Sequence, residues 1–341
     1  MAQSQMHREI LEIPAALERL LSLGTHDVEA AAEAIAARPQ PFAVTIARGS
    51  SDHAASFFKY ASELLTGRVV ASLGPSVASL YGSALQLAGS TALAISQSGK
   101  SPDIVMATKM AGEAGALTVA VTNDPSSELT QCAELTLPLH AGEERSVAAT
   151  KTFVSSSVLA AWVLAQVAKD EELLRAIKGL PAALHNAYHT DWGSLANELA
   201  SARSLFCLGR GPTNAIASEA ALKFKETSRL HAQAYSSAEV LHGPVAIVHE
   251  GFPVIAFATP GAAEASVVEV ADALAGMGAQ TFVTSPLATR STVLPRQDTG
   301  HPLTDAIALI VSFYTMVETL ARVRGLDPDL PRHLQKVTRT R

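Results

Sequence analysis

Apolar positions divide the chain into a helical opening and a longer part with strand-like runs. Up to residue 37, apolar side chains recur with helical spacing in two runs, at residues 10–21 and 28–37. From residue 41 onward, short apolar runs alternate with segments of helical composition, and the first four runs cover residues 42–47, 69–72, 92–96 and 117–121. This alternation predicts βαβ units around a parallel sheet that is buried on both faces.

The middle of the chain is predicted to be largely helical. An Ala-, Val- and Leu-rich helix is expected over residues 147–168, and more polar helices at about 171–185 and 192–202 lead to a strand at 205–208. In contrast, residues 325–336 contain too many Pro and Asp residues for a helix. We therefore expect an irregular tail.

The second half of the chain repeats the first. The matching segments are 47–51 with 209–213, 92–99 with 254–261, 115–119 with 278–282, and 80–82 with 241–243, at offsets between 161 and 163 residues. Glycine after a strand is common in α/β proteins, and this is the alternative explanation. Four matches in one order at nearly one offset favour an internal duplication. The predicted fold class is α/β, with two tandem doubly wound parallel-sheet domains.

Composition narrows the functional classes. Hydrophobic residues make up 48% of the 341 positions, which is enough for two cores, and the net charge of −6 argues against a nucleic-acid partner. Cys132 and Cys207 lie in apolar segments and are expected to be buried free thiols. Residues 1–13 lack a signal-peptide pattern, and the longest apolar run, around 306–313, is broken by polar residues. We expect a cytoplasmic protein with no apolar run long enough to span a membrane, and no membrane partner.

The strongest chemical signal is segment 95–103, which follows a strand and opens a helix. Ser96, Ser98 and Ser101 supply hydroxyls beside Gln97, and Gly99 lets the backbone bend closely around an anion. A well-capped βα turn with Ser101 at the N-cap is the alternative. The second copy has TPGA at 259–262, without the serines. Only the first copy is therefore predicted to bind phosphate.

Three further groups of residues are candidates for chemistry. Ser50 and Ser51 follow the strand at 42–47, at the same edge of the predicted sheet, where they can add hydroxyls to the site. Capping of a helix is the alternative, and Ser51 can serve both roles. Lys223 and Glu226 share one face of a predicted helix, for which a surface salt bridge is the alternative. His242 precedes a Gly-Pro turn, for which a structural role is the alternative.

Together these stretches resemble the tandem sugar-isomerase (SIS) domain family, in particular the isomerase half of glucosamine-6-phosphate synthase and the SIS-type glucosamine-6-phosphate deaminases. The likeness runs over nearly the whole chain, and its most specific stretches are 96–99, 148–153, 221–226, 231–235, 242–244 and 331–336. The resemblance implies two flavodoxin-like SIS domains with an N-terminal helical segment and an ordered C-terminal tail. The expected domains are a helical segment (1–40), a phosphate-binding domain (41–169), a second domain with its connecting helices (170–324) and a catalytic tail (325–341).

The resemblance also implies roles for individual residues. The sugar phosphate is held by Ser51, Ser96, Gln97, Ser98 and Ser101, with Ser50 beside them, and the sugar is lined by Val147 and Gln335. Glu226 moves a proton between C1 and C2 next to Lys223, and His242 reaches in from a neighbouring subunit to open the ring. Lys336 forms a Schiff base with the open-chain sugar. The expected assembly is a homodimer with a shared active site, and since no acidic or histidine cluster has ligand spacing, no metal or other cofactor is expected.

Departures from the synthase favour the reverse reaction. The synthase carries a glutaminase domain with a nucleophilic cysteine, whereas no cysteine precedes Cys132 here. We therefore expect a deaminase that converts glucosamine 6-phosphate to fructose 6-phosphate and ammonia. Ala149, His333 and Gln335 also differ from the synthase and leave the sugar open. Galactosamine 6-phosphate, fructosamine-type 6-phosphates and a non-catalytic role as a sugar-phosphate sensor remain alternatives.

Overall fold

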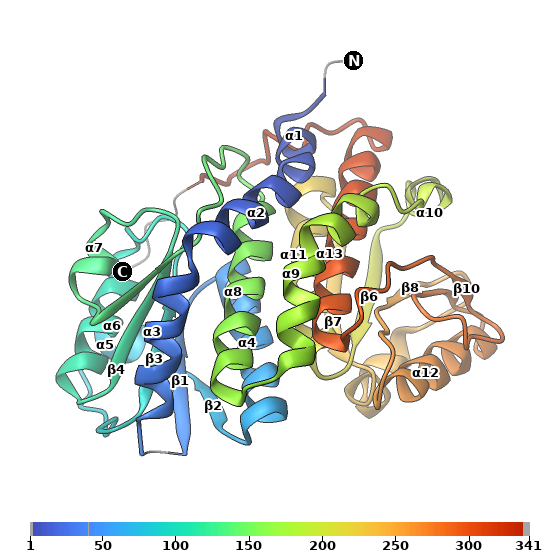
Figure 1. The fold of residues 1–341 in the computed structure, drawn as a ribbon. Helices are drawn as coiled ribbons and strands as arrows, with labels where there is room; N and C mark the ends of the chain where they lie inside the picture. Colours follow the sequence, from blue (N-terminus) through green and yellow to red (C-terminus); the bar gives the residue numbers. More distant parts are fainter. Residues whose placement is uncertain (1–2, 40, 337–341) are drawn as a thin grey trace. The chain divides into compact units, whose positions relative to one another are not determined.

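The chain folds as two α/β units of similar topology (Figure 1). The computed structural model describes residues 3–39 and 41–336. The first-repeat unit contains residues 13–145 and 151–178 together with Gln335 and Lys336 of the tail. The second-repeat unit contains residues 3–12, 146–150 and 179–334.

The first-repeat unit is built on a five-stranded parallel sheet of order β2-β1-β3-β4-β5. Its strands are β1 (Phe42–Ile46), β2 (Val69–Ser72), β3 (Thr91–Ile95), β4 (Leu117–Thr122) and β5 (Leu135–Pro138). This is the flavodoxin-like order of a doubly wound sheet. The four strand-like runs of the sequence are confirmed. The short edge strand β5 was missed because only one of its four residues is fully buried, which leaves a weak apolar pattern.

The second-repeat unit has a sheet of order β10-β9-β8-β6-β7, which is the same order as in the first-repeat unit read from the opposite edge. Its strands are β6 (Ser204–Gly209), β7 (His231–Ser236), β8 (Pro253–Ala256), β9 (Gln280–Val283) and β10 (Thr292–Val293). Gly49 and Gly211, paired by the repeat, have nearly identical backbone angles of φ 59°, ψ −134° and φ 59°, ψ −133°. The predicted duplication is therefore confirmed down to the turn after the first strand of each copy.

Helices flank both sheets. The first-repeat unit carries α2 (Ile13–Leu23), α3 (Thr25–Ala36), α4 (Ser50–Thr66), α5 (Ser76–Ser79), α6 (Pro102–Glu113), α7 (Glu128–Gln131) and α8 (Lys151–Ala168). The second-repeat unit carries α1 (Gln5–Leu11), α10 (Gly193–Glu198), α11 (Pro212–Ser228), the 3₁₀ turns η1 (Glu239–His242) and η2 (Pro244–Ile247), α12 (Glu264–Gly276) and α13 (Pro302–Val323). The division between the units falls within α9 (Glu171–Ala187).

Helix α8 begins at Lys151, so the predicted start at residue 147 is wrong. Two carboxylates hold the preceding segment out of the helix. Ser146 donates its backbone N–H to both side-chain oxygens of Glu9, at 3.2 and 3.4 Å. Glu144 accepts the backbone N–H of Thr152 at 3.1 Å and so occupies the amino-terminal end of α8.

The two longest apolar helices are core elements. Helix α8 packs on α4 in the first-repeat unit, and α13 packs on α11 in the second. Both α8 and α13 are long and apolar enough to cross a bilayer, so the expectation that no segment has this length was wrong. However, 83% and 78% of their apolar windows are buried inside the protein, as for core helices. Each fully buried Leu, Ile or Phe side chain contributes roughly 1.5–3 kcal/mol to folding.

The tail has no helix in its described part, as its Pro and Asp content predicted. It is nevertheless tied to the start of the chain within the second-repeat unit. The Asp329 carboxylate accepts the backbone N–H groups of Gln5 at 2.5 Å and Met6 at 2.8 Å, at the amino-terminal end of α1. These charge-assisted bonds satisfy donors that a helix leaves unpaired at its start. The tail is therefore ordered up to the residues that precede Lys336.

Candidate active site

A cavity of about 320 Å³ opens at the carboxyl ends of β1 and β3 in the first-repeat unit. Its lining contains Arg48, Gly49, Ser51, Ile95, Ser96, Gln97, Ser98, Ser101, Ile104 and Lys336. This lining includes the five residues that the resemblance assigned to the sugar phosphate. It also includes Lys336, which the resemblance assigned to a Schiff base. Clefts at this edge of a doubly wound sheet are the usual ligand sites of the fold.

The segment 95–103, called the serine loop from here on, is held against the end of β4 by hydrogen bonds of the loop backbone. The Gln97 carbonyl accepts the Asn123 N–H at 3.1 Å and the Thr122 hydroxyl at 3.3 Å. Gly99 has a φ of +61°, and a side chain there would place its Cβ 2.0 Å from the Ser127 hydroxyl oxygen. The tight approach therefore requires glycine at this position. The sequence identified this glycine by its place after the strand.

Ser101 occupies the N-cap position of α6, but its hydroxyl makes no capping hydrogen bond within the described structure. The hydroxyl instead lines the cavity. The start of α4 is also at the cavity, and its N-cap is Gly49, so the suggestion that Ser51 caps this helix is wrong. The first turns of α4 and α6 thus present positive helix ends to the cavity, which favours an anion.

Three predicted substrate residues do not line this cavity. Ser50 begins α4, one residue before Ser51, and is not part of the lining. Gln335 is exposed beside Lys336. Val147 is half-buried and belongs to the short segment of the second-repeat unit that Glu9 holds. Their assignment to the sugar remains a prediction.

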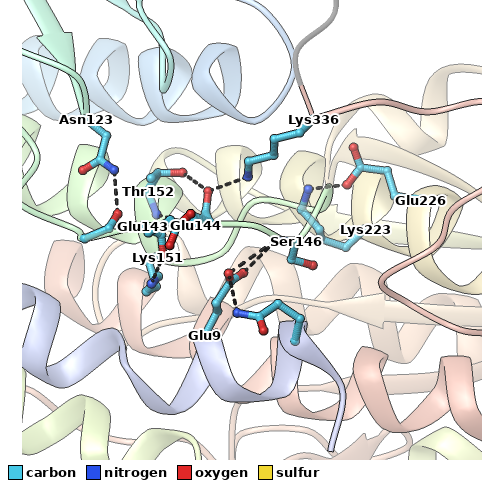
Figure 2. A network of polar contacts seen from close by, with 12 residues as sticks. Glu9, Asn123, Glu143, Glu144, Ser146, Lys151, Thr152, Lys223, Glu226 and Lys336 are labelled. Carbon is cyan, nitrogen blue, oxygen red and sulfur yellow. Dashed lines mark hydrogen bonds and ion pairs between the residues drawn. The ribbon is translucent and has the colours of Figure 1, made fainter. Parts of the chain in front are cut away.

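Lys336 forms an ion pair with a buried glutamate. Its Nζ lies 2.9 Å from Glu144 Oε2, and the Glu144 side chain is fully buried (Figure 2). Glu144 also accepts the Thr152 hydroxyl at 2.7 Å. The sequence analysis missed Glu144 because it stands in the run Glu143-Glu144-Arg145, which reads as a solvated charge cluster. No local pattern separates the buried glutamate from its exposed neighbour.

A second cluster of ionisable groups lies on α11 in the second-repeat unit. Lys223 is fully buried and its Nζ contacts Glu226 Oε2 and lies 3.2 Å from Glu219 Oε1 (Figure 2 shows the contact with Glu226). Tyr314 donates its hydroxyl to Glu219 at 3.2 Å. The predicted pairing of Lys223 and Glu226 on one helix face is confirmed, but the pair is no surface salt bridge. Glu219, one turn earlier, was missed because the sequence does not show that this helix face is buried.

The charge of Lys223 follows from its two carboxylate neighbours. Burial by itself lowers the pKa of a lysine, but Glu219 and Glu226 outweigh burial and leave the pKa of Lys223 above its ordinary value of 10.5. Lys223 is therefore an ammonium ion at neutral pH. Glu226 has a side chain that is 17% exposed, so it is the member of the cluster that a ligand can reach.

His242 ends the 3₁₀ turn η1 and is exposed at the surface of the second-repeat unit. The next residue, Gly243, has a φ of +139°, a conformation that side-chain-bearing residues avoid. This turn projects His242 outward. The structure thus places the histidine on a surface, and the proposed contribution to a neighbouring subunit remains a prediction.

Comparison with known sequences identifies relatives of both repeats. Residues 39–166 and 198–319 match the family model described as SIS domain. The chain is 32% identical over 345 residues to the glutamine–fructose-6-phosphate aminotransferase (isomerizing) of Thermococcus kodakarensis, covering 97% of this chain and 57% of the relative. It is 37% identical over 265 residues to the protein of the same name from Pyrobaculum aerophilum, covering 72% and 43%. The chain thus spans about half the length of the curated relatives it matches.

Among solved structures, a candidate phosphosugar isomerase from Silicibacter pomeroyi DSS-3 superposes with a TM-score of 0.93. The two sequences are 53% identical, and the match covers 96% of this chain and 100% of the other. The similarity therefore extends over both repeats and most of the helical segments around them.

Proposed function

We propose that this chain, which belongs to the SIS domain family, is a phosphosugar isomerase that converts glucosamine 6-phosphate to fructose 6-phosphate and ammonia. The observation that supports this most is the cavity of the first-repeat unit, where four serine side chains and Gln97 lie together with the amine of Lys336. The named activity of the relatives joins an amino group to fructose 6-phosphate, and the proposed reaction runs on the same class of substrate.

The phosphate end of the substrate fits the serine side of the cavity. Ser96, Ser98 and Ser101 present hydroxyl groups around Gly99, and Ser51 adds another from the first turn of α4. Hydroxyls and helix amino termini bind phosphate without a dedicated metal ion. This part of the site selects for a phosphorylated ligand and fixes its distance from Lys336.

Glu226 is the proposed base for isomerisation. In the open-chain amino sugar, it takes the proton from C2 and returns it to C1. The amine nitrogen loses one proton and O1 gains one, so that the C1 aldehyde and C2 amine become a C1 hydroxyl and a C2 imine. Lys223 stays charged beside it because of Glu219, and an adjacent ammonium ion stabilises the negative charge that develops on oxygen during the proton transfer. The proton count is unchanged overall.

Lys336 is the proposed nucleophile for nitrogen release. Its neutral amine adds to the C2 imine and expels ammonia, which leaves a Schiff base between Nζ and C2, and water then releases the ketose. Glu144 holds the ammonium form of Lys336 at 2.9 Å and is placed to accept the proton that the lysine must lose before attack. Thr152 keeps the carboxylate in position.

His242 is the proposed acid and base for ring opening, acting from a second copy of the chain. Its exposure suits this role, and an imidazole side chain can act as both acid and base. The proposed assembly is accordingly a homodimer in which each site uses residues of both chains.

The test is a panel of substrates assayed for ammonia and for fructose 6-phosphate. Glucosamine 6-phosphate, galactosamine 6-phosphate, a fructosamine-type 6-phosphate and unphosphorylated glucosamine are compared at equal concentration. The proposal predicts the highest rate with glucosamine 6-phosphate, little with glucosamine, and a fall of about 10²–10⁴-fold in Glu226→Gln. A preference for another phosphosugar would reassign the substrate. Phosphosugar binding without turnover would instead support a sensor.

A further inference from the structure

Arg48 lines the cavity but has no role in the proposed function, which assigns phosphate binding to serine hydroxyls and nitrogen release to Lys336. It follows the end of β1 at Ile46 after one intervening residue, Ala47, and lines the same cavity as Ser51, Ser96 and Ser101. Its side chain is 47% exposed, so the guanidinium group is accessible from the cavity mouth. The inference below rests on the proposed function, because it concerns the same phosphosugar.

The guanidinium group is held at one point only. Arg48 Nε lies 2.6 Å from Asp103 Oδ2, and the Asp103 side chain is fully buried in the first turn of α6. Among the described residues, Arg48 makes no other hydrogen bond or ion pair. One of the five N–H donors of the guanidinium is used, and the four on its terminal nitrogens remain for a ligand. An arginine fixed at Nε presents its two terminal nitrogens as a fork, which suits two phosphate oxygens.

The negative charges of the phosphate and of nearby carboxylates are a second reason to expect a cation in this cavity. A phosphate monoester brings about −1.5 to −2 charges at neutral pH, while the buried Asp103 already carries a carboxylate beside the serine loop. Asp52, in the first turn of α4, adds a second acid. Burial raises the pKa of Asp52, and His53 and Arg48 lower it. Lys336 is engaged by Glu144, so Arg48 is the cation placed at the phosphate end.

We propose that Arg48 binds the phosphate group of the substrate through its terminal nitrogens, and that Asp103 acts as the positioning residue that aims the guanidinium at the cavity. The serine hydroxyls then fix the orientation of the phosphate, and Arg48 supplies the charge that distinguishes it from a neutral hydroxyl group. Discrimination between phosphorylated and unphosphorylated sugars therefore depends on this arginine.

The second repeat provides a matched internal control. Arg210 occupies the position equivalent to Arg48, before a glycine with nearly the same backbone angles. There, however, Ala265 stands where the first copy has Asp103, and Ala258 where it has Ser96. Arg210 is exposed and lacks both the positioning acid and the serine loop. Replacing Arg210 changes net charge by the same amount as replacing Arg48, without touching the cavity.

The experiment is a calorimetric titration of the full-length protein with fructose 6-phosphate, inorganic phosphate and fructose. Arg48→Gln is expected to weaken binding of fructose 6-phosphate and of inorganic phosphate by about 10- to 100-fold, with fructose unaffected. Arg210→Gln is expected to stay within about twofold. Arg48→Lys, which keeps the charge but not the fork, should recover part of the loss. Asp103→Asn should weaken phosphate binding less than Arg48→Gln does.

Because Arg48→Gln leaves the buried Asp103 without its partner, the double variant Arg48→Gln/Asp103→Asn is titrated as well, with folding checked by thermal melting. A folded double variant that binds fructose 6-phosphate as tightly as the wild type would overturn the role of Arg48 and leave the proposed function standing. A wild-type protein that binds fructose 6-phosphate no better than fructose would overturn the phosphate site itself, and with it both proposals.

Discussion

Lys336 Nζ lies 2.9 Å from the buried Oε2 of Glu144, 192 positions earlier in the chain. Burying a carboxylate is costly unless it is paired, so Glu144 attracts a cation, and the tail supplies it. The amine proposed as nucleophile is thereby held at the cavity that the serine loop lines. This relationship links the end of the chain to the first repeat and underlies the first prediction.

Glu144→Gln is expected to remove the ion pair with Lys336 while keeping an acceptor for Thr152. Because the serine loop is untouched, kcat should fall by about 10- to 100-fold with little change in KM. Independently of activity, trypsin should cleave after Lys336 faster in the variant, because the side chain it recognises has lost its ion pair with Glu144. Glu143→Gln, at the exposed neighbouring position, serves as the control. Equal cleavage rates in Glu144→Gln and wild type would contradict the proposed docking of the tail.

Lys223→Met is expected to destabilise the protein strongly. It removes one member of the fully buried ion pair between Lys223 and Glu219, and removing one partner of such a pair costs about 3–5 kcal/mol. Lys225→Met, two residues further along the same helix and exposed, should cost less than about 0.5 kcal/mol. Urea denaturation of both variants and the wild type measures these differences. Similar costs at the two positions would argue against a compensating role for Lys223.

The pH dependence of stability provides a separate check on Lys223. Because its folded pKa is raised above 10.5, the stabilisation it provides is fully present below that value and is lost only as the pH rises through the raised pKa. The difference in unfolding free energy between wild type and Lys223→Met should therefore stay constant from about pH 7 to about pH 10. A difference that shrinks steadily across this range would show that Lys223 titrates there.

Gly99→Ala is expected to abolish binding of fructose 6-phosphate. The added Cβ would fall 2.0 Å from the Ser127 hydroxyl at a φ of +61°, so the serine loop has to move. Its repeat counterpart Gly261 has a φ of +124° and would bring a Cβ no nearer than 3.6 Å to Pro302. Gly261→Ala should therefore cost stability through backbone strain, about 1–3 kcal/mol, yet retain phosphosugar binding. Retained binding in Gly99→Ala would contradict the location of the phosphate site.

A site shared between two chains predicts complementation. Glu226→Ala and His242→Ala homodimers should each be inactive, because each site lacks one group. Co-expressed chains, purified with two different tags, should form mixed dimers with one intact site and up to about half of the wild-type activity per dimer. Mixed dimers as inactive as the parents would show that His242 acts within its own chain or not at all.

The sequence predicted the fold and its strands better than it predicted the buried ion pairs. Four strands of the first sheet followed from apolar runs. The internal repeat predicted the second sheet and the matching turns at Gly49 and Gly211. Edge strands such as β10, with two exposed residues, carry no apolar pattern to detect. The start of α8 was misplaced because two glutamates hold the segment before it. Glu9 is distant in the sequence and Glu144 is close to the helix start, and the sequence shows neither contact.

In the candidate site, too, residues marked by a local sequence pattern were predicted, and residues whose role depends on burial were not. The hydroxyls of the serine loop were found because they follow a strand and surround a glycine, which is a local signal. Glu144, Glu219 and Arg48 were not assigned roles, because their importance depends on burial and on partners that lie far away in the sequence or one turn away on a buried face. Charge runs in a sequence do not reveal which member is buried.

The most direct test of the account follows the purified protein with glucosamine 6-phosphate in D₂O by proton NMR, with ammonia measured in parallel. The account predicts one ammonia for each fructose 6-phosphate formed, with deuterium entering C1 only to the extent that the proton held on Glu226 exchanges with solvent. Conversion by Glu226→Gln should be slower by about 10²–10⁴-fold. A nitrogen-containing isomer of glucosamine 6-phosphate formed without ammonia, or no reaction of a protein that still binds fructose 6-phosphate, would contradict the proposed deaminase.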